Sequence, residues 1–468
     1  MDDSALRKVV GRLPLAEAAL HVWAWVASKA FLDEVYSRHR GRSYQWILTF
    51  PVMVYLIADA LLHYRGSGRR SFQAAKDEGS LEASITAAFG KLRRLPIPLS
   101  MGFLTDCTVR LMELFPEDVP AVELPVSLAR MEPVILDGKA IKRVAKRLKP
   151  LQGIGGGILG GRALVALRLR RGVAVAMEAH PDGHVNDVRF VPQLLPRVRA
   201  VVPGTRIFLG DRQFCLLVHL GHYLEGGDHF LIRYSERVSF SRDRQRAVRR
   251  GVDQQGRAYE EEWGWLGRAS EPQRRYVRRI TVQRANAEPV SVITDLLDAD
   301  LYPASDLLAL YGQRWGIENC FQQVTEVFGL QGLIGSSPQA TVFQFAFCLV
   351  LYNILQLIRA YVAQASDHKV AEVSTEKLFL DVQNQLIAWN EVITPRETIR
   401  LIEPLPLEQT RRRLEKLLRN VWTDAWRKAP PQKRQRSQHS GKRCHMSAYR
   451  ILQESRSCKS KLAKDSSG

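Results

Sequence analysis

The first 125 residues alternate long apolar stretches with short polar breaks, which is typical of a helical region. Apolar residues recur at helical spacing from Leu15 to Tyr36 and from Trp46 to Tyr64. The glycine-containing break at residues 66–68 interrupts this pattern, and Leu81 to Leu95 resumes it. We therefore predict a helical N-terminal region over residues 1–125.

From residue 126 the pattern changes to short apolar runs separated by turns. Two β-rich runs joined by Arg170-Arg171-Gly172 predict a hairpin. The predicted strands are Val134–Asp137, Ala163–Leu169, Val173–Ala179, Thr205–Leu209 and His229–Arg233, and the predicted helices are Asp187–Arg199 and Phe214–Tyr223. This order within residues 126–235 matches the first part of a ribonuclease H-like core, in which the first and fourth strands lie side by side. The predicted fold class is therefore α/β.

The remaining pattern divides the rest of the chain. Alternation in residues 236–293 predicts a β-rich insertion, and residues 294–360 complete the core with a helix that contains Glu318. Residues 361–426 form a helical C-terminal region. Residues 427–468 are polar and basic, and we expect this tail to be disordered and to bind nucleic acid or simply to aid solubility.

A glycine-rich loop runs from Gln152 to Arg162. It lacks the Gly-Lys-Ser/Thr ending of a phosphate-binding P-loop. We interpret it as a flexible connection between strands.

The charge of the chain narrows the class of partner. The chain has 468 residues, a net charge of +20 and a pI near 9.9. A nucleic acid is the simplest partner for such a chain, because lysine and arginine neutralise its phosphates. The alternative is that the surface is generally basic and binds no polyanion. Basic side chains gather at the breaks between the predicted helices of the N-terminal region. Two interpretations fit this pattern equally well, namely a DNA-binding surface and a basic face that is simply exposed to solvent. These residues are Arg65, Arg69, Arg70, Lys91, Arg93 and Arg94.

No targeting or membrane signal accompanies this charge. The N-terminus lacks a signal-peptide layout, and the apolar stretches Trp46–Ala58 and Phe343–Ile358 read as core helices rather than membrane spans. The six cysteines lack zinc-site spacing. We expect an intracellular, reduced protein.

Three acidic residues stand where a metal-dependent phosphoryl-transfer site needs them. Asp137 and Asp211 each end an apolar run, and Glu318 lies in a helix-like stretch. Two aspartates at strand ends and one glutamate on a helix can converge on a pair of divalent cations, which activate a hydroxyl and stabilise the leaving oxygen of a phosphodiester. We therefore predict DNA strand cleavage and joining.

The helix with Glu318 shows a second pattern. Tyr311, Arg314, Glu318 and Thr325 are spaced by three, four and seven residues, which keeps them on one helical face. Such a face presents a carboxylate to metal while Arg314 and Tyr311 bind phosphate. The alternative is an Arg–Glu surface pair with Tyr311 and Trp315 packed inside.

These residues also carry a resemblance. The chain resembles the DDE transposases of bacterial insertion sequences, in particular the insertion sequence four family with its Tyr-x2-Arg-x3-Glu-x6-Lys signature. Tyr311, Arg314 and Glu318 match in register, whereas Thr325 replaces the lysine. The segments Ile135–Gly138, Gly210–Phe214 and Thr294–Leu297 also resemble the family, and the likeness spans roughly residues 80–360.

The resemblance implies cut-and-paste transposition by a bacterial cytoplasmic, nucleoid-associated enzyme. Asp137, Asp211 and Glu318 would hold two Mg²⁺ or Mn²⁺ ions, and Arg212 and Arg314 would contact phosphates. Gln322 is a further candidate for hydrogen bonding to phosphate in the absence of the lysine. The implied partners are the terminal inverted repeats, target DNA and a second copy of the chain in a synaptic complex, without a membrane.

Two other functions remain open from the sequence. A metal-dependent DNA nuclease would use the same carboxylates without strand joining. A DNA-binding derivative would have lost catalysis, which the presence of all three acidic residues disfavours.

Overall fold

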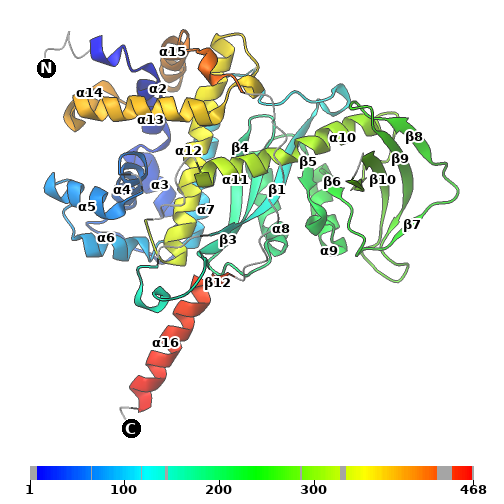
Figure 1. The fold of residues 1–468 in the computed structure, drawn as a ribbon, viewed down its shortest axis with the longest axis horizontal. Helices are drawn as coiled ribbons and strands as arrows, with labels where there is room; N and C mark the ends of the chain where they lie inside the picture. Colours follow the sequence, from blue (N-terminus) through cyan, green and yellow to red (C-terminus); the bar gives the residue numbers. More distant parts are fainter. Residues whose placement is uncertain are drawn as a thin grey trace.

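The computed structural model describes residues 8–428 and 445–465, except for residues 65, 118, 143–145, 285–286 and 327–333. Within these residues, a ten-stranded mixed sheet forms the centre of the molecule. Helices from both ends of the chain gather at one end of this sheet, and strands β7 to β10 extend it at the other end (Figure 1).

The N-terminal region is helical, as its pattern predicts. Its helices are α2 (Pro14–Val26), α3 (Lys29–His39), α4 (Phe50–Leu62), α5 (Gly68–Asp77), α6 (Ile85–Leu92) and α7 (Ile97–Met112). The predicted helix from Trp46 starts later, because the Thr49 side chain accepts a hydrogen bond from Val52 N and so caps α4 at Phe50. Trp46 therefore lies in the loop before α4 and not in a core helix.

The central sheet is built from the strands of two segments. The first holds β1 (Met131–Ile141), β3 (Gly161–Arg168), β4 (Val173–His180), β5 (Thr205–Gly210) and β6 (His229–Arg233). The second holds β7 (Phe240–Arg242), β8 (Arg249–Val252), β9 (Ala258–Leu266), β10 (Arg275–Arg284) and β11 (Ala287–Thr294). The strand order is β4-β3-β1-β5-β6-β11-β10-β9-β7, and β8 pairs with β9.

The predicted neighbourhood of the first and fourth strands is confirmed. β1 pairs with β5 in parallel, and β3 and β4 form the predicted antiparallel hairpin. The prediction that Asp137 ends a strand is wrong. Beyond Asp137, β1 keeps its antiparallel pairing with β3 as far as Ile141, and these backbone hydrogen bonds extend the strand.

The β-rich segment after β6 continues the core sheet. β11 pairs antiparallel with β6, so the strands of this segment join the same sheet as β1 and β5. Two helices connect the parallel strands, namely α8 (Val191–Val201) between β4 and β5 and α9 (Leu217–Leu224) between β5 and β6. Pro192 falls in the first turn of α8, where a missing N–H is tolerated.

The second half of the chain is mostly helical. Its helices are α10 (Ala304–Gly312), α11 (Gly316–Glu326), α12 (Pro338–Ala365), α13 (Thr375–Val392), α14 (Pro395–Leu401) and α15 (Leu407–Leu418). α12 is buried along nearly its whole length and packs against α7 and β4. The Asn353 amide on α12 exchanges hydrogen bonds with Ala174 N at 2.9 Å and Ala174 O at 2.7 Å, which fastens this helix to β4.

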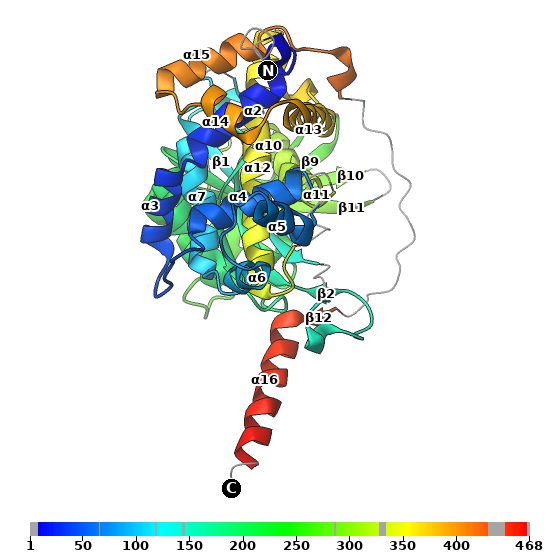
Figure 2. The ribbon, with the colours of Figure 1, turned by 90° about the vertical axis from the view of Figure 1, so that its left-hand side faces the viewer.

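One described helix, α12, is long and apolar enough to cross a membrane by length and composition alone. Its apolar window is wholly buried by the rest of the protein, and a core helix passes the same test. We therefore treat α12 as the central core helix, seen in yellow beside α7 in Figure 2.

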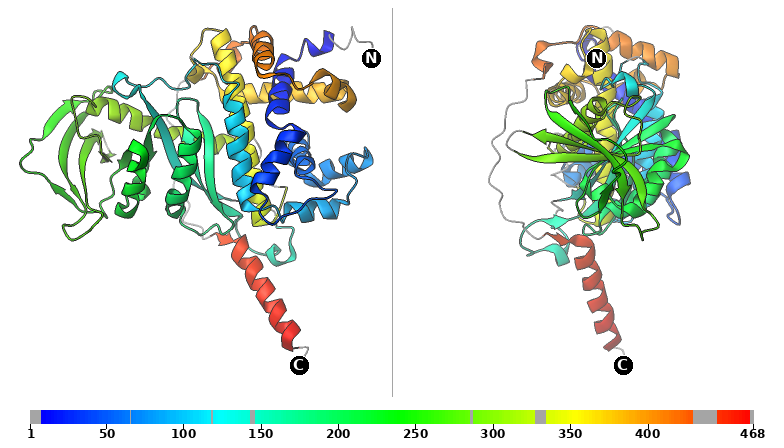
Figure 3. Two further views of the ribbon diagram at one scale, coloured as in Figure 1. Left: turned by 180° about the vertical axis from the view of Figure 1, so that it is seen from behind. Right: turned by 90° about the vertical axis from the view of Figure 1, so that its right-hand side faces the viewer.

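The predicted disorder of the C-terminal tail is wrong for residues 446–465. They form β12 (Met446–Ser447) and α16 (Ala448–Asp465), and α16 projects from the body in every view (Figure 3). β12 pairs with β2 (Ile158–Leu159) inside the glycine-rich loop, and Ala448 packs there against Leu151. Strand pairing and apolar contact thus order both segments, while the basic run at residues 433–436 lies outside the described residues.

Candidate active site

Two of the predicted acidic residues lie on neighbouring strands. β1 and β5 run parallel, with Ile135 opposite Leu209. Carrying this register two residues further brings Asp137 beside Asp211, because paired strands advance together. β5 ends at Gly210, so Asp211 directly follows its carboxyl end, as predicted.

Local backbone contacts orient both carboxylates. The Asp211 side chain caps the short helix η4 (Arg212–Phe214), and its Oδ1 accepts a hydrogen bond from Gln213 N at 2.8 Å. Asp137 Oδ1 accepts a hydrogen bond from Gly138 N, also at 2.8 Å. Each carboxylate is therefore held in place by the turn or strand that follows it.

The third acidic residue comes from a helical segment that is not one regular helix. α10 ends at Gly312, a 3-10 turn η6 spans Gln313–Trp315, and Glu318 lies in the first turn of α11. The prediction of a single helical face is therefore only partly right. Arg314 Nη2 does donate to Glu318 Oε1 at 2.9 Å, so these two side chains meet as an i,i+4 pair.

Tyr311 has a different partner. Its hydroxyl donates to Gly210 O at 3.4 Å, across 101 residues of sequence. This contact joins the end of α10 to the end of β5, immediately before Asp211. Tyr311 is thus placed to position the β5 terminus relative to the segment that carries Glu318.

The charges of these groups act on one another. The pKa of Asp137 is raised to about 7, mainly by burial and in smaller part by the carboxylates of Asp211 and Glu318, against the lowering effects of the Gly138 N–H hydrogen bond and of Arg314. Burial works against the charged form of Arg314, but Tyr311, Glu318 and Asp137 more than compensate and raise its pKa. Asp137, Asp211, Arg314 and Glu318 therefore form one electrostatically coupled group.

The donor chemistry of this group fits a divalent cation. Carboxylate oxygens are the ligands that Mg²⁺ and Mn²⁺ prefer, and a cation would neutralise the charge that Asp211 and Glu318 impose on Asp137. In the part of the chain that the structure describes, no group of three or more His, Cys, Asp or Glu side chains is arranged to hold a metal ion. The three carboxylates are therefore coupled electrostatically but are not gathered around one point. One oxygen of Glu318 already accepts a hydrogen bond from Arg314.

The other predicted DNA-contacting residues lie near this group. Arg212 and Gln322 are exposed, on η4 and α11 respectively. Thr325 is half-buried, and its hydroxyl donates to Phe321 O at 2.6 Å within α11. The Thr325 hydroxyl is thus used in a hydrogen bond to the backbone of α11. The roles of Arg212, Gln322 and Thr325 in DNA binding stay predictions.

Sequence reasoning missed a second arginine beside Asp211. Arg233 ends β6, the parallel neighbour of β5, and it lines a groove of about 620 Å³ together with Arg212 and Arg237. Its charge also acts to lower the pKa of Tyr311, which burial raises to about 12. The sequence did contain a signal for Arg233, because it ends the predicted strand His229–Arg233 that follows the strand before Asp211. The ends of parallel strands meet at one edge of a sheet, so Arg233 could have been expected near Asp211.

Gly138, next to Asp137, has no room for a side chain. A Cβ there would lie 1.2 Å from Asp187 Oδ2, and Asp187 is fully buried and bound by Arg162 at 3.0 Å. Gly138→Ala should therefore lower the free energy of unfolding by about 1–3 kcal/mol through overpacking. Urea unfolding measures this loss, and Gly312→Ala is the control because a Cβ there meets nothing within 4 Å. Equal stability of the two variants would contradict the packing seen at Gly138.

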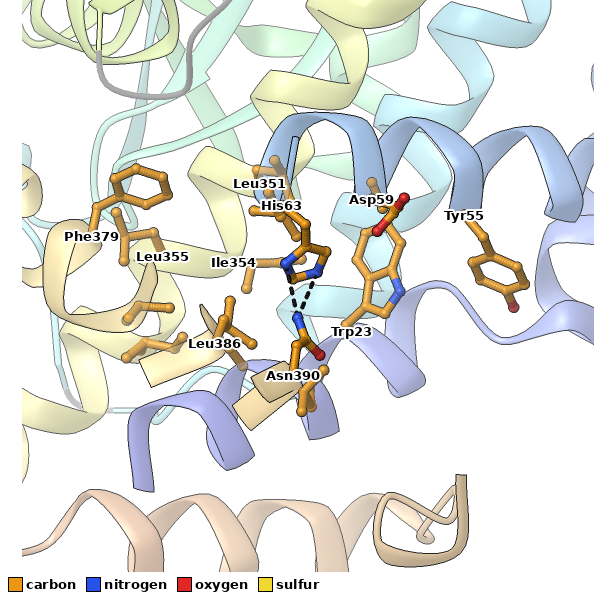
Figure 4. A pocket seen from close by; sticks show the side chains of 16 residues that line it. Trp23, Tyr55, Asp59, His63, Leu351, Ile354, Leu355, Phe379, Leu386 and Asn390 are labelled. Atoms are coloured by element: carbon orange, nitrogen blue, oxygen red, sulfur yellow. Dashed lines mark hydrogen bonds between the residues drawn. The ribbon is translucent and has the colours of Figure 1, made fainter. Parts of the chain in front are cut away.

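A separate cavity of about 220 Å³ lies among the helices. It is lined mainly by apolar side chains of α2, α4, α12 and α13, and the Asn390 amide hydrogen-bonds the His63 ring at 2.8 Å on its polar edge (Figure 4). None of Asp137, Asp211 and Glu318 lines it. We therefore place the candidate chemistry at the β1 and β5 edge and not in this cavity.

Two comparisons with known proteins found similarities. Residues 129–354 match the family model of the transposase DDE domain, a range that contains Asp137, Asp211 and Glu318. This match supports a transposase function. A search of curated proteins found no match. Among solved structures, the chain is similar to a piggyBac transposase in a synaptic complex with hairpin DNA, with a TM-score of 0.39 and 11% identity over 88% of this chain and 87% of that one.

Proposed function

We propose that this chain is the transposase of a bacterial insertion sequence of the insertion sequence four type and moves its element by metal-dependent cut-and-paste transposition. One observation carries the proposal. Inside the matched region, the parallel register of β1 and β5 brings Asp137 beside Asp211, and Glu318 acts electrostatically on the same group. Mg²⁺ or Mn²⁺ is the proposed cofactor, bound as two ions by these three carboxylates.

The sheet supports a ribonuclease H-like core for this enzyme. The order β4-β3-β1-β5-β6 comprises an antiparallel meander followed by two parallel strands. This arrangement keeps the first and fourth strands adjacent, as the proposed core requires. The strands of residues 240–294 then form the β-rich insertion before the segment with Glu318.

The residues of this site have distinct proposed roles. Divalent cations would lower the pKa of an attacking water and stabilise charge on the leaving oxygen. Arg314 holds the Glu318 carboxylate through its 2.9 Å contact, and Arg212 and Arg314 offer guanidinium groups to DNA phosphate. Tyr311 acts as a positioning residue through Gly210. In the joining step a DNA 3′-hydroxyl takes the place of water as nucleophile.

The proposed partners follow from this reaction. The enzyme would bind double-stranded DNA at the terminal inverted repeats and at the target, and would act as a homodimer in a synaptic complex. The net charge of +20 supports binding to a polyanion. The proposed location is the bacterial cytoplasm, at the nucleoid.

The test uses the full chain and a DNA fragment that carries the repeats flanking its gene. We expect strand breaks at the repeat ends and joined products longer than the substrate on a denaturing gel with Mg²⁺, and neither with EDTA. Cleavage without joining would favour the nuclease. Binding without cleavage would favour an inactive DNA-binding derivative, and the absence of both binding and cleavage would contradict the proposal.

A further inference from the structure

The loop between α3 and α4 presents two aromatic rings to solvent. Tyr44 is 82% exposed and Trp46 is 84% exposed. Ile47 beside them is 50% exposed. Large apolar side chains gathered at the surface mark an interaction site, because burying them against a partner is favourable.

This loop is held by specific contacts. Lys91 Nζ, from α6, donates to Tyr44 O at 2.7 Å, and Gln45 Oε1 accepts from Phe50 N at 2.8 Å. The Tyr36 hydroxyl donates to Ser43 Oγ at 3.2 Å. The backbone on both sides of Trp46 is thus anchored, and the exposure of the rings is a property of a fixed loop.

The surface around the rings is basic. The loop and α6 enclose a groove of about 660 Å³ whose charged lining residues are Arg40, Arg42, Lys91 and Arg94. Among the described residues that line it, none is acidic. Burial lowers the pKa of Lys91, and the positive charge of the neighbouring Arg94 lowers it further.

A second groove continues around α6. Its volume is about 920 Å³, and it shares Ala87 and Arg94 with the first groove. It adds Arg69, Arg93 and Arg147, again with no acidic side chain among its described lining residues. The two grooves therefore form one basic track on both sides of α6.

This track extends to residues that lie in the chain between β1 and α12. Arg147, which follows β1 in the chain, donates to Ile334 O at 3.2 Å, just before α12. The Ile334 side chain packs closely on the start of α5, since a Cβ on Gly68 would lie 2.2 Å from Ile334 Cγ2. The N-terminal helices and the segments adjoining β1 and α12 thus share this surface.

We propose that the two grooves around α6 form a DNA-binding surface, in which the arginines contact phosphates and Trp46 and Tyr44 pack against nucleotides. The inference rests on the proposed function and names the surface that holds the DNA substrate. Guanidinium groups neutralise backbone phosphates, and aromatic rings stack on unpaired bases of any sequence, as at an opened DNA end. The acid-free lining favours this polyanion over a second protein chain.

The test measures binding of a fluorescent DNA duplex with a single-stranded overhang by the full chain across a salt series. Trp46→Ala should weaken binding about 10-fold, by loss of ring stacking, and Trp46→Phe should restore most of the affinity. The double variant Arg42→Ala/Arg94→Ala should weaken binding and lower the salt slope by about two phosphate contacts. Ile399→Ala, at a residue that is 74% exposed on α14, is the control and should bind as the wild type does.

The outcomes separate this inference from the proposed function. Wild-type affinity and salt slope in both groove variants, with an unaltered melting temperature, would overturn the inference even if the wild type cleaves DNA. Loss of self-association in Trp46→Ala with unchanged DNA affinity would assign the surface to a second copy and would also overturn it. If the variants lose binding as expected but the wild type makes no metal-dependent breaks, the DNA-binding surface is supported and the proposed transposase activity is contradicted.

Discussion

Asp211→Asn should lower the rate of metal-dependent DNA cleavage by more than about 100-fold while DNA binding changes little. Loss of an outer-shell partner alone costs about 10–100-fold at metal sites, so loss of a proposed ligand should cost more. Asparagine is as good a helix cap as aspartate, so the η4 turn should survive. Cleavage is read on a denaturing gel at saturating Mg²⁺, and binding is read by fluorescence anisotropy.

The matched control is Asp300→Asn, which removes one negative charge from a side chain that is 84% exposed and lies outside the candidate site. It should cleave DNA at close to the wild-type rate. Substantial cleavage by Asp211→Asn would remove Asp211 from the proposed metal site. Loss of binding in the same variant would instead assign it a structural role.

Glu261→Ala should lower the free energy of unfolding by about 3–5 kcal/mol, because it leaves a buried guanidinium without its counter-charge. Arg278 on β10 is 0% exposed, and its Nε donates to Glu261 Oε2 on β9 at 2.8 Å. Burial lowers the pKa of Arg278, and Glu261 opposes that effect. Urea unfolding followed by tryptophan fluorescence measures the loss.

Glu260→Ala is the control from the adjacent position of β9. Glu260 pairs with Arg250 at 2.6 Å, but the two side chains are 45% and 75% exposed. A surface pair of this kind contributes about 0–1 kcal/mol, so this variant should remain close to wild-type stability. Similar losses in the two variants would show that the Glu261–Arg278 pair is not the buried anchor of the β9–β10 segment.

The local sequence pattern was sufficient to predict those elements whose structure depends on residues close together in the chain. Periodicity and turn residues predicted the β3–β4 hairpin and the strand before Asp211, and the structure contains both. The helix boundaries were less predictable, because the cap at Thr49 moved the start of α4 past Trp46. That shift of a few residues turned an expected core residue into an exposed ring.

Contacts across long sequence distances were invisible to such reasoning. β12 and α16 are ordered because Met446–Ser447 pairs with Ile158–Leu159, nearly 300 residues earlier in the chain. Whether a polar tail is ordered depends on whether another segment of the chain pairs with it, and amino-acid composition does not reveal that segment. Likewise, β11 finds its neighbour β6 only in the folded sheet.

The candidate site shows the same division. The sequence by itself determined which side chains could do the chemistry, since Asp137, Asp211 and Glu318 stand at recognisable places in strand and helix patterns. Only the tertiary structure decided the residue register in which β1 and β5 pair, the contact of the Tyr311 hydroxyl with Gly210 O, and the hydrogen bond from Arg314 to the Glu318 carboxylate. Residue type and local periodicity are properties of short segments, whereas register, side-chain partners and pKa depend on atoms that folding brings from distant segments.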